Sequence, residues 1–589
     1  MNKIQKQLAI LGLVMFVMIT SCSKDWLEPK PLSFFSPENV YVDKEGFESM
    51  LYTLRKALKS ENTGYLNSIA AEYSASDLAS PWSQLDFHKL TPNQSQYYPF
   101  LDFFTDTFGH IKNANVAISR IDDIEWDSQD DRNAILAEAL WHKAYWYYRL
   151  VNTYGDVPYV NEEITGEKLD FQTTSRWTIL TQLEEDLEFA AQWLPDVAGP
   201  GDISKGAANY LLTKVYLANS NFDQAIASID KVIEGPYALM ENRFGVDVAD
   251  SNRNLIWDLH RPKNFNSSEN RETILAVVDR FEAPSDARSE GLYTMRNYNA
   301  QWFQPAVLDS QGAPGMTIDG SGQVMYDSLG RGNCNVRLTH HYQYNLWNYG
   351  GQTWENTQDL RRADINWVDK HELLYNNPSS VDFGTPVKEE YFAQAIDTFK
   401  YIYAMPHYIM YVPQDDPTAR PMGGNGDWYL FRLAGAYLLR AEAYYWKDQL
   451  ADAADDINRV RQRANAIPIT SGDVTLDFIF DERARELFAE APRHSELVRV
   501  SYMLAQLNRD GYSLSAFGDK NYYYDRVMKY NKTYEKQVTL LGNTAGMEPY
   551  HVLWPIPSDI ITANTLGVIN QNYGYDGYER NVPPLEVIE

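Results

Sequence analysis

Between residues 41 and 235, hydrophobic side chains recur every three or four positions, and this spacing constrains the fold more than any other feature. It is the spacing that places apolar residues on one face of an α-helix. The first such stripe consists of Phe47, Met50, Leu51, Leu54 and Leu58. Further stripes run through 111–121, 134–151 and 177–194, and Pro195 ends the last of them. The sequence therefore predicts a mostly helical protein.

Two of the predicted helix pairs follow the pattern of tetratricopeptide repeats. Ala207 and Ala208 are small enough to allow close helix approach, and Phe222 and Ala225 open the partner helix. The same pattern of small and aromatic residues returns at 438–460. We therefore expect a helical-repeat scaffold whose two parts are separated by one long insertion.

The insertion is rich in Gly, Pro, Asn and Tyr, and its periodicity fades. A short β-like run occurs at 273–278, and Gly423 and Gly424 mark a turn. Because binding residues concentrate on loops held by a rigid scaffold, we expect the ligand site here. The sequence predicts one domain over 41–589, made of helical repeats (41–244), the insertion (245–425), returning helices (426–510) and an irregular C-terminal segment (511–589).

The first residues have the features of a secretion signal. Lys3 and Lys6 precede an apolar stretch over 8–19, which is shorter than the about 20 residues that span a bilayer. Thr20 and Ser21 then lead into Cys22, a pattern that resembles the bacterial lipobox. The prediction is a signal peptide over 1–21, a lipidated (palmitate-carrying) Cys22 and a tether over 22–40. An ordinary signal peptide with a chance cysteine is the alternative.

Composition narrows the possible ligands. The net charge of −28 argues against nucleic acid, because an acidic surface repels phosphate. With only two Cys, one of them at the lipobox, no disulfide framework is expected. Aromatic residues make up 14% of the chain, and Tyr and Trp offer flat apolar faces with a polar group, which suits sugar binding. An aromatic-rich helical core would account for many of them equally well.

Catalytic motifs are missing from the sequence. It has no P-loop, no G-x-G-x-x-G, no H-E-x-x-H, no G-x-S-x-G and no cysteine cluster, and the adjacent His340 and His341 are a poor metal motif. Three acidic residues, Glu482, Glu486 and Glu490, recur at four-residue spacing. We interpret them as an ion network with neighbouring arginines rather than as a glycosidase pair. The expected arginines are Arg459, Arg461, Arg463, Arg483, Arg485 and Arg493.

Five ordered blocks resemble one known family. The first is Ala-Leu-Trp-His-Lys-Ala-Tyr at 139–145, which continues to Tyr-Gly-Asp-Val-Pro at 154–158, and the second is Ser-Lys-Gly-Ala-Ala at 204–208. The others are Asn-Arg-Val-Arg-Gln-Arg-Ala at 458–464, Glu-Arg-Ala-Arg-Glu-Leu at 482–487, and Pro-Ile-Pro at 555–557 followed by Gln-Asn-Tyr-Gly-Tyr at 571–575. The chain thus resembles the SusD/RagB family of Bacteroidota outer-membrane lipoproteins. Ala491-Pro492 departs from the family, which usually has a Gly at that turn.

The resemblance implies a SusD-like fold, mostly α, in which a tetratricopeptide-like scaffold carries an irregular α/β insertion. It implies a non-catalytic protein, without cofactor or metal, that is lipid-anchored at the cell outer membrane and exposed on its surface. Such a protein captures oligosaccharide and passes it to a SusC-like TonB-dependent transporter. Three alternatives stay open: a peptide ligand as in the RagB type, an anchored glycoside hydrolase, and a scaffold that binds only protein.

The resemblance also places candidate ligand contacts, by segment. The first group lies after the early helices, the second in the insertion and the third further along it. Aromatic candidates are Trp82, Tyr97, Tyr98, Tyr298, Trp302, Trp347, Tyr349 and Trp354. Polar candidates are Asp77, Arg296, Asn299 and Arg331.

Overall fold

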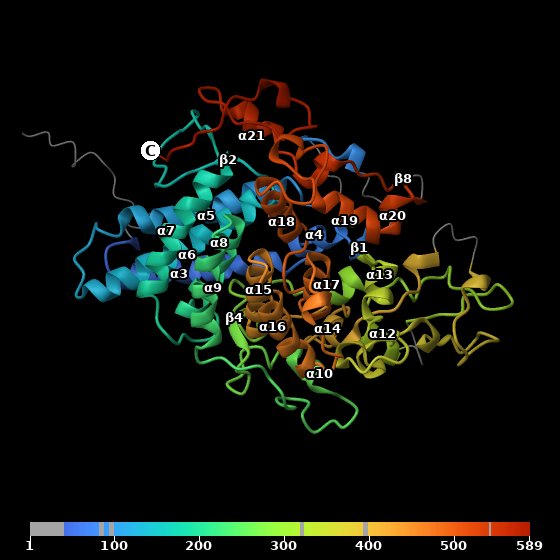
Figure 1. Cartoon of the computed structure of the whole chain (residues 1–589). Coiled ribbons are helices and arrows are strands. Elements are labelled where there is room, and N and C mark those ends of the chain that lie inside the picture. Colours follow the sequence, from blue (N-terminus) through green and yellow to red (C-terminus); the bar gives the residue numbers. More distant parts are fainter. Residues whose placement is uncertain are drawn as a thin grey trace, which may run out of the picture.

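The computed structural model describes residues 40–81, 87–93, 99–318, 323–392, 398–540 and 543–588. Helices dominate it, and the few strands are short (Figure 1). The chain begins with helices α3 (Lys44–Ala57), α4 (Ser68–Ser74), α5 (Asp102–Arg120), α6 (Gln129–Val151), α7 (Arg176–Trp193), α8 (Lys205–Ala218) and α9 (Phe222–Ile233). Between them lie strands β1 (Ala79–Ser80), β2 (Val157–Pro158) and β3 (Thr173–Thr174).

These helices form where the periodicity predicts them. Ser204 caps α8, since its hydroxyl accepts a hydrogen bond from the Ala207 N–H at 3.2 Å. The long helix α6 is buried along most of its length, and the Trp141 indole donates to the Ala207 carbonyl at 3.2 Å. Consecutive helices from α5 to α9 pack against one another in pairs, as in helical-repeat proteins.

The insertion contains short elements only. They are α10 (Leu255–Leu259), β4 (Thr273–Val277), α11 (Thr294–Tyr298), α12 (Gln323–Leu329), β5 (Arg337–Leu338), α13 (His340–Gln343), α14 (His407–Met410) and β6 (Trp428–Arg432), with several 3₁₀ turns. Strands β4 and β6 pair antiparallel, with Thr273 opposite Arg432 and Val277 opposite Trp428. This pairing brings the first part of the insertion beside its last part and feeds the chain directly into the next helix.

The scaffold then resumes. Its elements are α15 (Leu433–Trp446), α16 (Leu450–Arg463), α17 (Leu476–Glu486), α18 (His494–Gln506), α19 (Tyr522–Tyr530), α20 (Lys532–Glu535), β7 (Thr539–Leu540), β8 (Asn543–Thr544) and α21 (Ser558–Ala563). Helix α15 packs on α9, and Arg440 pairs with Asp230 across this contact at 2.7 Å. The helices before and after the insertion therefore form one scaffold, while α12 and α13 of the insertion lie to one side (Figure 1).

The predicted ion network joins α16 and α17 and is buried. Glu482 pairs with Arg461 at 2.7 Å and with Arg361 at 2.8 Å, and Glu486 pairs with Arg432 at 2.5 Å. Although burial alone would raise it, the surrounding guanidinium groups lower the pKa of Glu486 to about 2. A carboxylate so enclosed is held ionised by its partners. The prediction of a network is confirmed, and Arg361 of the insertion and Arg432 at the end of β6 are members that spacing along the helices did not indicate.

Some details of that prediction were wrong. Arg483 pairs with Glu496 and Arg493 with Asp77, rather than with the three glutamates. Glu490 lies beyond the end of α17 and pairs with Arg432 at 2.6 Å and His260 at 3.0 Å, so it does not continue the helix face. Arg459 is exposed on α16, and the structure gives it no ion pair with a described residue, because the helix turns it away from α17.

Candidate ligand-binding face

Four of the predicted site residues cannot be located. Cys22, Trp82, Tyr97 and Tyr98 lie outside the described residues, and their roles stay predictions.

Asp77 belongs to the interior rather than to a ligand site. Its side chain is fully buried and pairs with Arg493 at 2.6 Å and with Arg526 at 2.7 Å. Burial alone would raise the pKa of this carboxyl, but the charges of the two arginines lower it well below its usual value. The prediction of a ligand contact was wrong because both carboxylate oxygens are already bound.

The second predicted group, Tyr298, Asn299 and Trp302, is buried too. Trp302 has no exposed surface, and its indole N–H donates to the Gly330 carbonyl at 3.0 Å. The Asn299 amide donates to the Leu329 carbonyl at 2.7 Å. Their role as ligand contacts is therefore corrected: Trp302 and Asn299 hold the loop that follows α12, and Tyr298 packs in the core.

The third predicted group is divided between core and surface. Trp347 is buried and donates to the Tyr342 carbonyl at 2.8 Å, so its prediction as a ligand contact was wrong. Tyr349 is half-buried, with the Arg461 guanidinium 4.8 Å from its ring centroid, and Trp354 is half-buried in the same loop. The three rings do not form one open arc, and binding by Tyr349 or Trp354 stays a prediction.

Arg296 and Arg331 are the predicted residues that the structure brings together at a surface. The Arg296 guanidinium donates to the Arg331 carbonyl at 3.1 Å, and both side chains are half-buried. The segment 421–424 holds both backbones: the Arg296 N–H donates to the Met422 carbonyl at 2.9 Å and the Arg331 N–H to the Pro421 carbonyl at 2.7 Å. One segment thus fixes the register of the two arginines.

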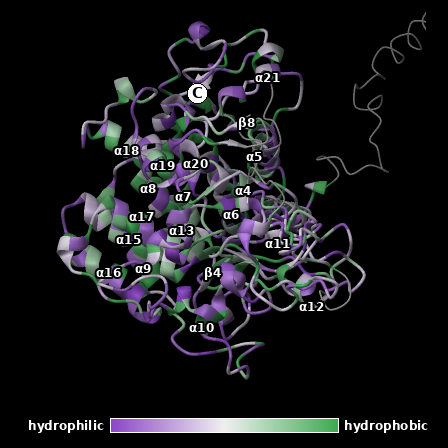
Figure 2. Cartoon of the chain, turned by 90° about the vertical axis from the view of Figure 1, so that its right-hand side faces the viewer, coloured by the Kyte–Doolittle hydropathy of each residue, from purple (hydrophilic) through white to green (hydrophobic). Residues whose placement is uncertain are grey.

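Three segments frame this face, namely 63–66, 290–299 and 330–336. Helix α11, which is labelled in Figure 2, carries Arg296 within the second segment. The Gly64 N–H donates to the Gly291 carbonyl at 2.9 Å, and the Asn333 N–H donates to the Arg296 carbonyl at 2.8 Å. Gly423 packs behind them with φ of +107°, where an added Cβ would lie 2.5 Å from the Thr294 nitrogen. Only glycine fits there, which gives the predicted turn at 423–424 a structural role.

Tyr65 is the aromatic residue of this face, and it was missed. The Tyr65 side chain is 47% exposed. Its hydroxyl accepts a hydrogen bond from the Asn333 side-chain amide at 3.0 Å and donates one to the side-chain oxygen of Asn335 at 3.3 Å. The Arg296 guanidinium lies 5.8 Å from the ring centroid. The Asn residues beside Arg331 were a signal in the sequence, whereas nothing in the helical pattern near Tyr65 separated it from the core. We call Tyr65, Arg296, Arg331 and Asn333 the arginine–tyrosine face.

The backbone around this face is strained. Leu66, Tyr293 and Cys334 have φ of 55°, 53° and 58°, in the left-handed region that side chains other than glycine seldom adopt. Each costs on the order of 1–3 kcal/mol and persists only where the surroundings impose it. All three lie in the framing segments, so that the fold maintains a conformation here that local preference does not favour.

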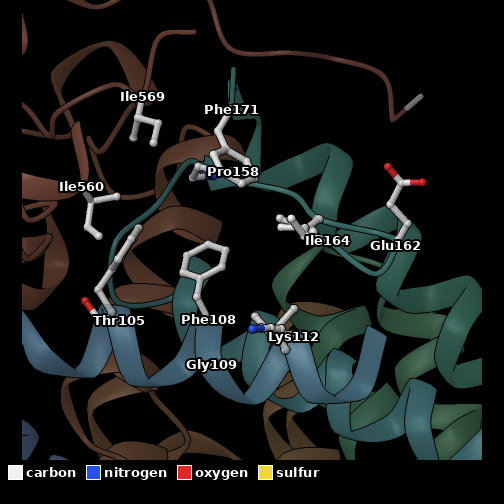
Figure 3. A pocket seen from close by; sticks show the side chains of 13 residues that line it. Thr105, Phe108, Gly109, Lys112, Pro158, Glu162, Ile164, Phe171, Ile560 and Ile569 are labelled. Atoms are coloured by element: carbon white, nitrogen blue, oxygen red, sulfur yellow. The ribbon is translucent and has the colours of Figure 1, made fainter. Parts of the chain in front are cut away.

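An apolar pocket lies away from this face. It has a volume of about 310 Å³ and is lined by α5, by the loop after β2 and by the C-terminal segment, with Phe108, Pro158, Ile164, Phe171 and Ile560 around it (Figure 3). Its walls offer few polar groups, whereas a sugar needs partners for its hydroxyls. None of the predicted ligand contacts lines it.

Within the described ranges, no group of three or more His, Cys, Asp or Glu side chains could hold a metal ion. In the same part of the chain, no helix is both long and apolar enough to cross a membrane.

Fold and face together define a helical-repeat protein with a polar and aromatic surface formed by its insertion and by residues 63–66. A sequence model of the SusD family matches residues 309–575, and a model described as "Starch-binding associating with outer membrane" matches residues 25–217. The chain belongs to the SusD family.

Individual relatives are distant but cover most of the chain. SusD-like protein P25 of Formosa agariphila is 23% identical over 84% of this chain and 90% of its own length. The starch-binding protein SusD of Bacteroides thetaiotaomicron is 25% identical over 60% of this chain and 62% of its own. The structure of surface glycan-binding protein A from Bacteroides fluxus superposes with a TM-score of 0.60, 18% identity and coverage of 91% and 100%, which supports the SusD-like fold.

Proposed function

We propose that this chain is a non-catalytic glycan-binding lipoprotein of the cell outer membrane. It captures an oligosaccharide on the arginine–tyrosine face and delivers it to a SusC-like TonB-dependent transporter. Lipidation of Cys22 anchors it, and the body is exposed on the cell surface. The names of the relatives support this: one is called starch-binding, and one model of the family refers to association with the outer membrane.

One observation carries the proposal. Tyr65 presents an exposed ring whose hydroxyl is fixed by Asn333 and Asn335, with Arg296 beside it. An aromatic ring can lie against the apolar C–H face of a pyranose, while amide and guanidinium groups bind its hydroxyls. Because the ring is already held in place, little side-chain entropy is lost on binding.

Calorimetric titration of the full chain in detergent, against a panel of oligosaccharides with peptides as controls, tests the proposal. We expect dissociation constants in the micromolar to millimolar range for one glycan class, with no cleavage of the ligand on long incubation. Replacement Tyr65→Ala should weaken binding about tenfold or more, because it removes the stacking ring. Tyr52→Ala is the matched control, since Tyr52 is similarly exposed (54%) but lies on α3.

Two results would contradict the proposal. Binding of peptides without binding of any glycan would assign the site to another class of nutrient. Equal losses of affinity in the Tyr65 and Tyr52 variants would place the ligand elsewhere on the surface.

A further inference from the structure

The side chains of Arg296 and Arg331 bring two positive charges close together, and no carboxylate of a described residue pairs with either. The Arg296 guanidinium donates to the Arg331 carbonyl at 3.1 Å. Burial, and then the neighbouring charge of Arg331, lower the pKa of Arg296 below its usual value. Two like charges that are partly removed from water raise the free energy of the unliganded face.

Among the residues that the structure describes, no carboxylate forms an ion pair with Arg296 or Arg331. Glu290 lies on a framing segment, but its carboxylate accepts from the Tyr293 hydroxyl at 3.3 Å and makes no ion pair with either arginine. The contrast with the interior is clear, since Arg361 and Arg432 each bind several carboxylates. The chain has 80 acidic and 52 basic residues, so a shortage of acidic groups does not explain why these two arginines lack a carboxylate partner.

The Arg331 side chain is also unengaged. Its backbone N–H and carbonyl are both bonded, but its guanidinium makes neither a hydrogen bond nor an ion pair with a described residue. A half-buried guanidinium whose N–H groups are not used by described residues can bind a carboxylate or sulfate group through two parallel hydrogen bonds. The exposed Tyr65 ring and the Asn333 amide beside the pair provide the surroundings that a sugar ring requires.

From this arrangement we infer that the arginine–tyrosine face binds an anionic saccharide, one that carries a carboxylate or a sulfate ester. The guanidinium groups of Arg296 and Arg331 hold the acidic group, while Tyr65 lies against the sugar ring and the side-chain oxygen of Asn333, whose amide nitrogen is already bonded to Tyr65 and Asn335, accepts from a hydroxyl. The inference rests on the proposed function and narrows its ligand class. The shared chemistry is an oxyanion on a sugar, and the experiment separates the two sources of that oxyanion.

The test measures calorimetric affinities of the full chain in detergent at low salt for three oligosaccharide sets of equal length. One set is neutral glucose oligomers, one is galacturonic acid oligomers and one is sulfated galactose oligomers. We expect one acidic set to bind about tenfold or more tightly than the neutral set, as charge-assisted contacts imply. Whichever acidic set binds more tightly identifies the anion.

Arg331 is the residue to change, because its side chain supports no other contact among the described residues. Arg331→Gln should reduce affinity for the acidic ligand about tenfold and affinity for neutral sugars much less, because the glutamine amide can still donate to a hydroxyl but cannot pair with an anion. Arg331→Lys, which keeps the charge, should restore part of the loss. Arg509→Gln is the matched control, because Arg509 is a half-exposed arginine that pairs with Asp448 on the scaffold at 3.1 Å.

The possible outcomes distinguish a failure of the anionic-ligand inference from a failure of the proposed glycan-binding function. If neutral and acidic oligomers bind equally, or if Arg331→Gln weakens both to the same extent, the anionic ligand is excluded and glycan capture stands. If no glycan of any set binds while a peptide does, the proposed function itself is overturned.

Discussion

At the residue scale, two buried histidines couple stability to pH. His494 stacks on Trp554 with ring centroids 4.9 Å apart, and its Nε2 lies 3.0 Å from the Val552 carbonyl. Burial lowers the pKa of His494 to about 3, and burial together with the neighbouring His88 lowers the pKa of His551 to about 3. In the unfolded chain both titrate near 6.5.

The sign of the effect follows from these pKa values. Below about pH 6.5 the two histidines become protonated in the unfolded chain, whereas in the folded chain they stay neutral down to about pH 3. The free energy of unfolding therefore falls as the pH falls through this window. Between pH 7 and pH 5 each histidine should contribute a loss of about 2 kcal/mol. Urea denaturation at the two pH values measures the difference, and His494→Phe should reduce it by that amount.

His340→Phe is the matched control, because His340 is exposed on α13. A pH dependence that is the same in the native chain and in the His494 variant would show that His494 takes up a proton as readily in the folded chain as in the unfolded one, contrary to its burial.

At the scale of elements, the loop after α12 depends on Trp302. The indole of this buried residue bonds the Gly330 carbonyl, and Arg331 follows directly. We expect Trp302→Phe to weaken glycan binding severalfold, because the lost hydrogen bond is worth about 1 kcal/mol and frees the loop that presents Arg331. Trp302→Ala should cost about 3–5 kcal/mol of stability through the cavity it leaves.

Trp347 provides the comparison. It is equally buried and bonds the Tyr342 carbonyl, but it supports a different part of the insertion. Trp347→Phe should therefore lower the melting temperature to a similar degree without changing glycan affinity. If both Phe variants keep full affinity, the loop is held by its backbone bonds alone.

At the scale of the whole molecule, periodic segments could be predicted and irregular ones could not. Stripes such as the one on α3 predict helices because the spacing of apolar residues depends only on local geometry. The acidic spacing on α17 likewise indicated an ion network, yet Arg361 of the insertion and Arg432 of β6 join it through contacts distant in sequence. Spacing within one helix carries no information about such partners.

The ligand face shows the same limit more strongly. Trp302 and Trp347 lie in segments without periodicity, so the sequence could not distinguish an inward from an outward ring, and both proved buried. Arg296 and Arg331 were predicted as site residues and do lie together. Tyr65, whose ring lies beside Arg296, comes from a distant part of the chain. The position of such a face depends on tertiary contacts, and it follows from the fold rather than from any one segment.

The net charge of the whole molecule sets how an acidic ligand approaches. With −28 overall, the protein repels an anionic oligosaccharide at long range, whereas the arginines of the face attract it only at contact. The screening length is about 30 Å at 0.01 M salt and about 10 Å at 0.1 M, so added salt removes the repulsion first. We expect the association rate constant to rise severalfold between 10 and 150 mM salt, and stopped-flow fluorescence would measure it.

This dependence is opposite to that of oppositely charged partners, whose association slows as salt is added. The dissociation rate should rise as well, because salt also screens the contacts of Arg296 and Arg331, so that the affinity changes less than either rate. Neutral oligosaccharides of the same length should show neither effect. An association rate that falls with salt would mean that the local field of the arginine pair extends beyond the acidic surface and steers the ligand from a distance.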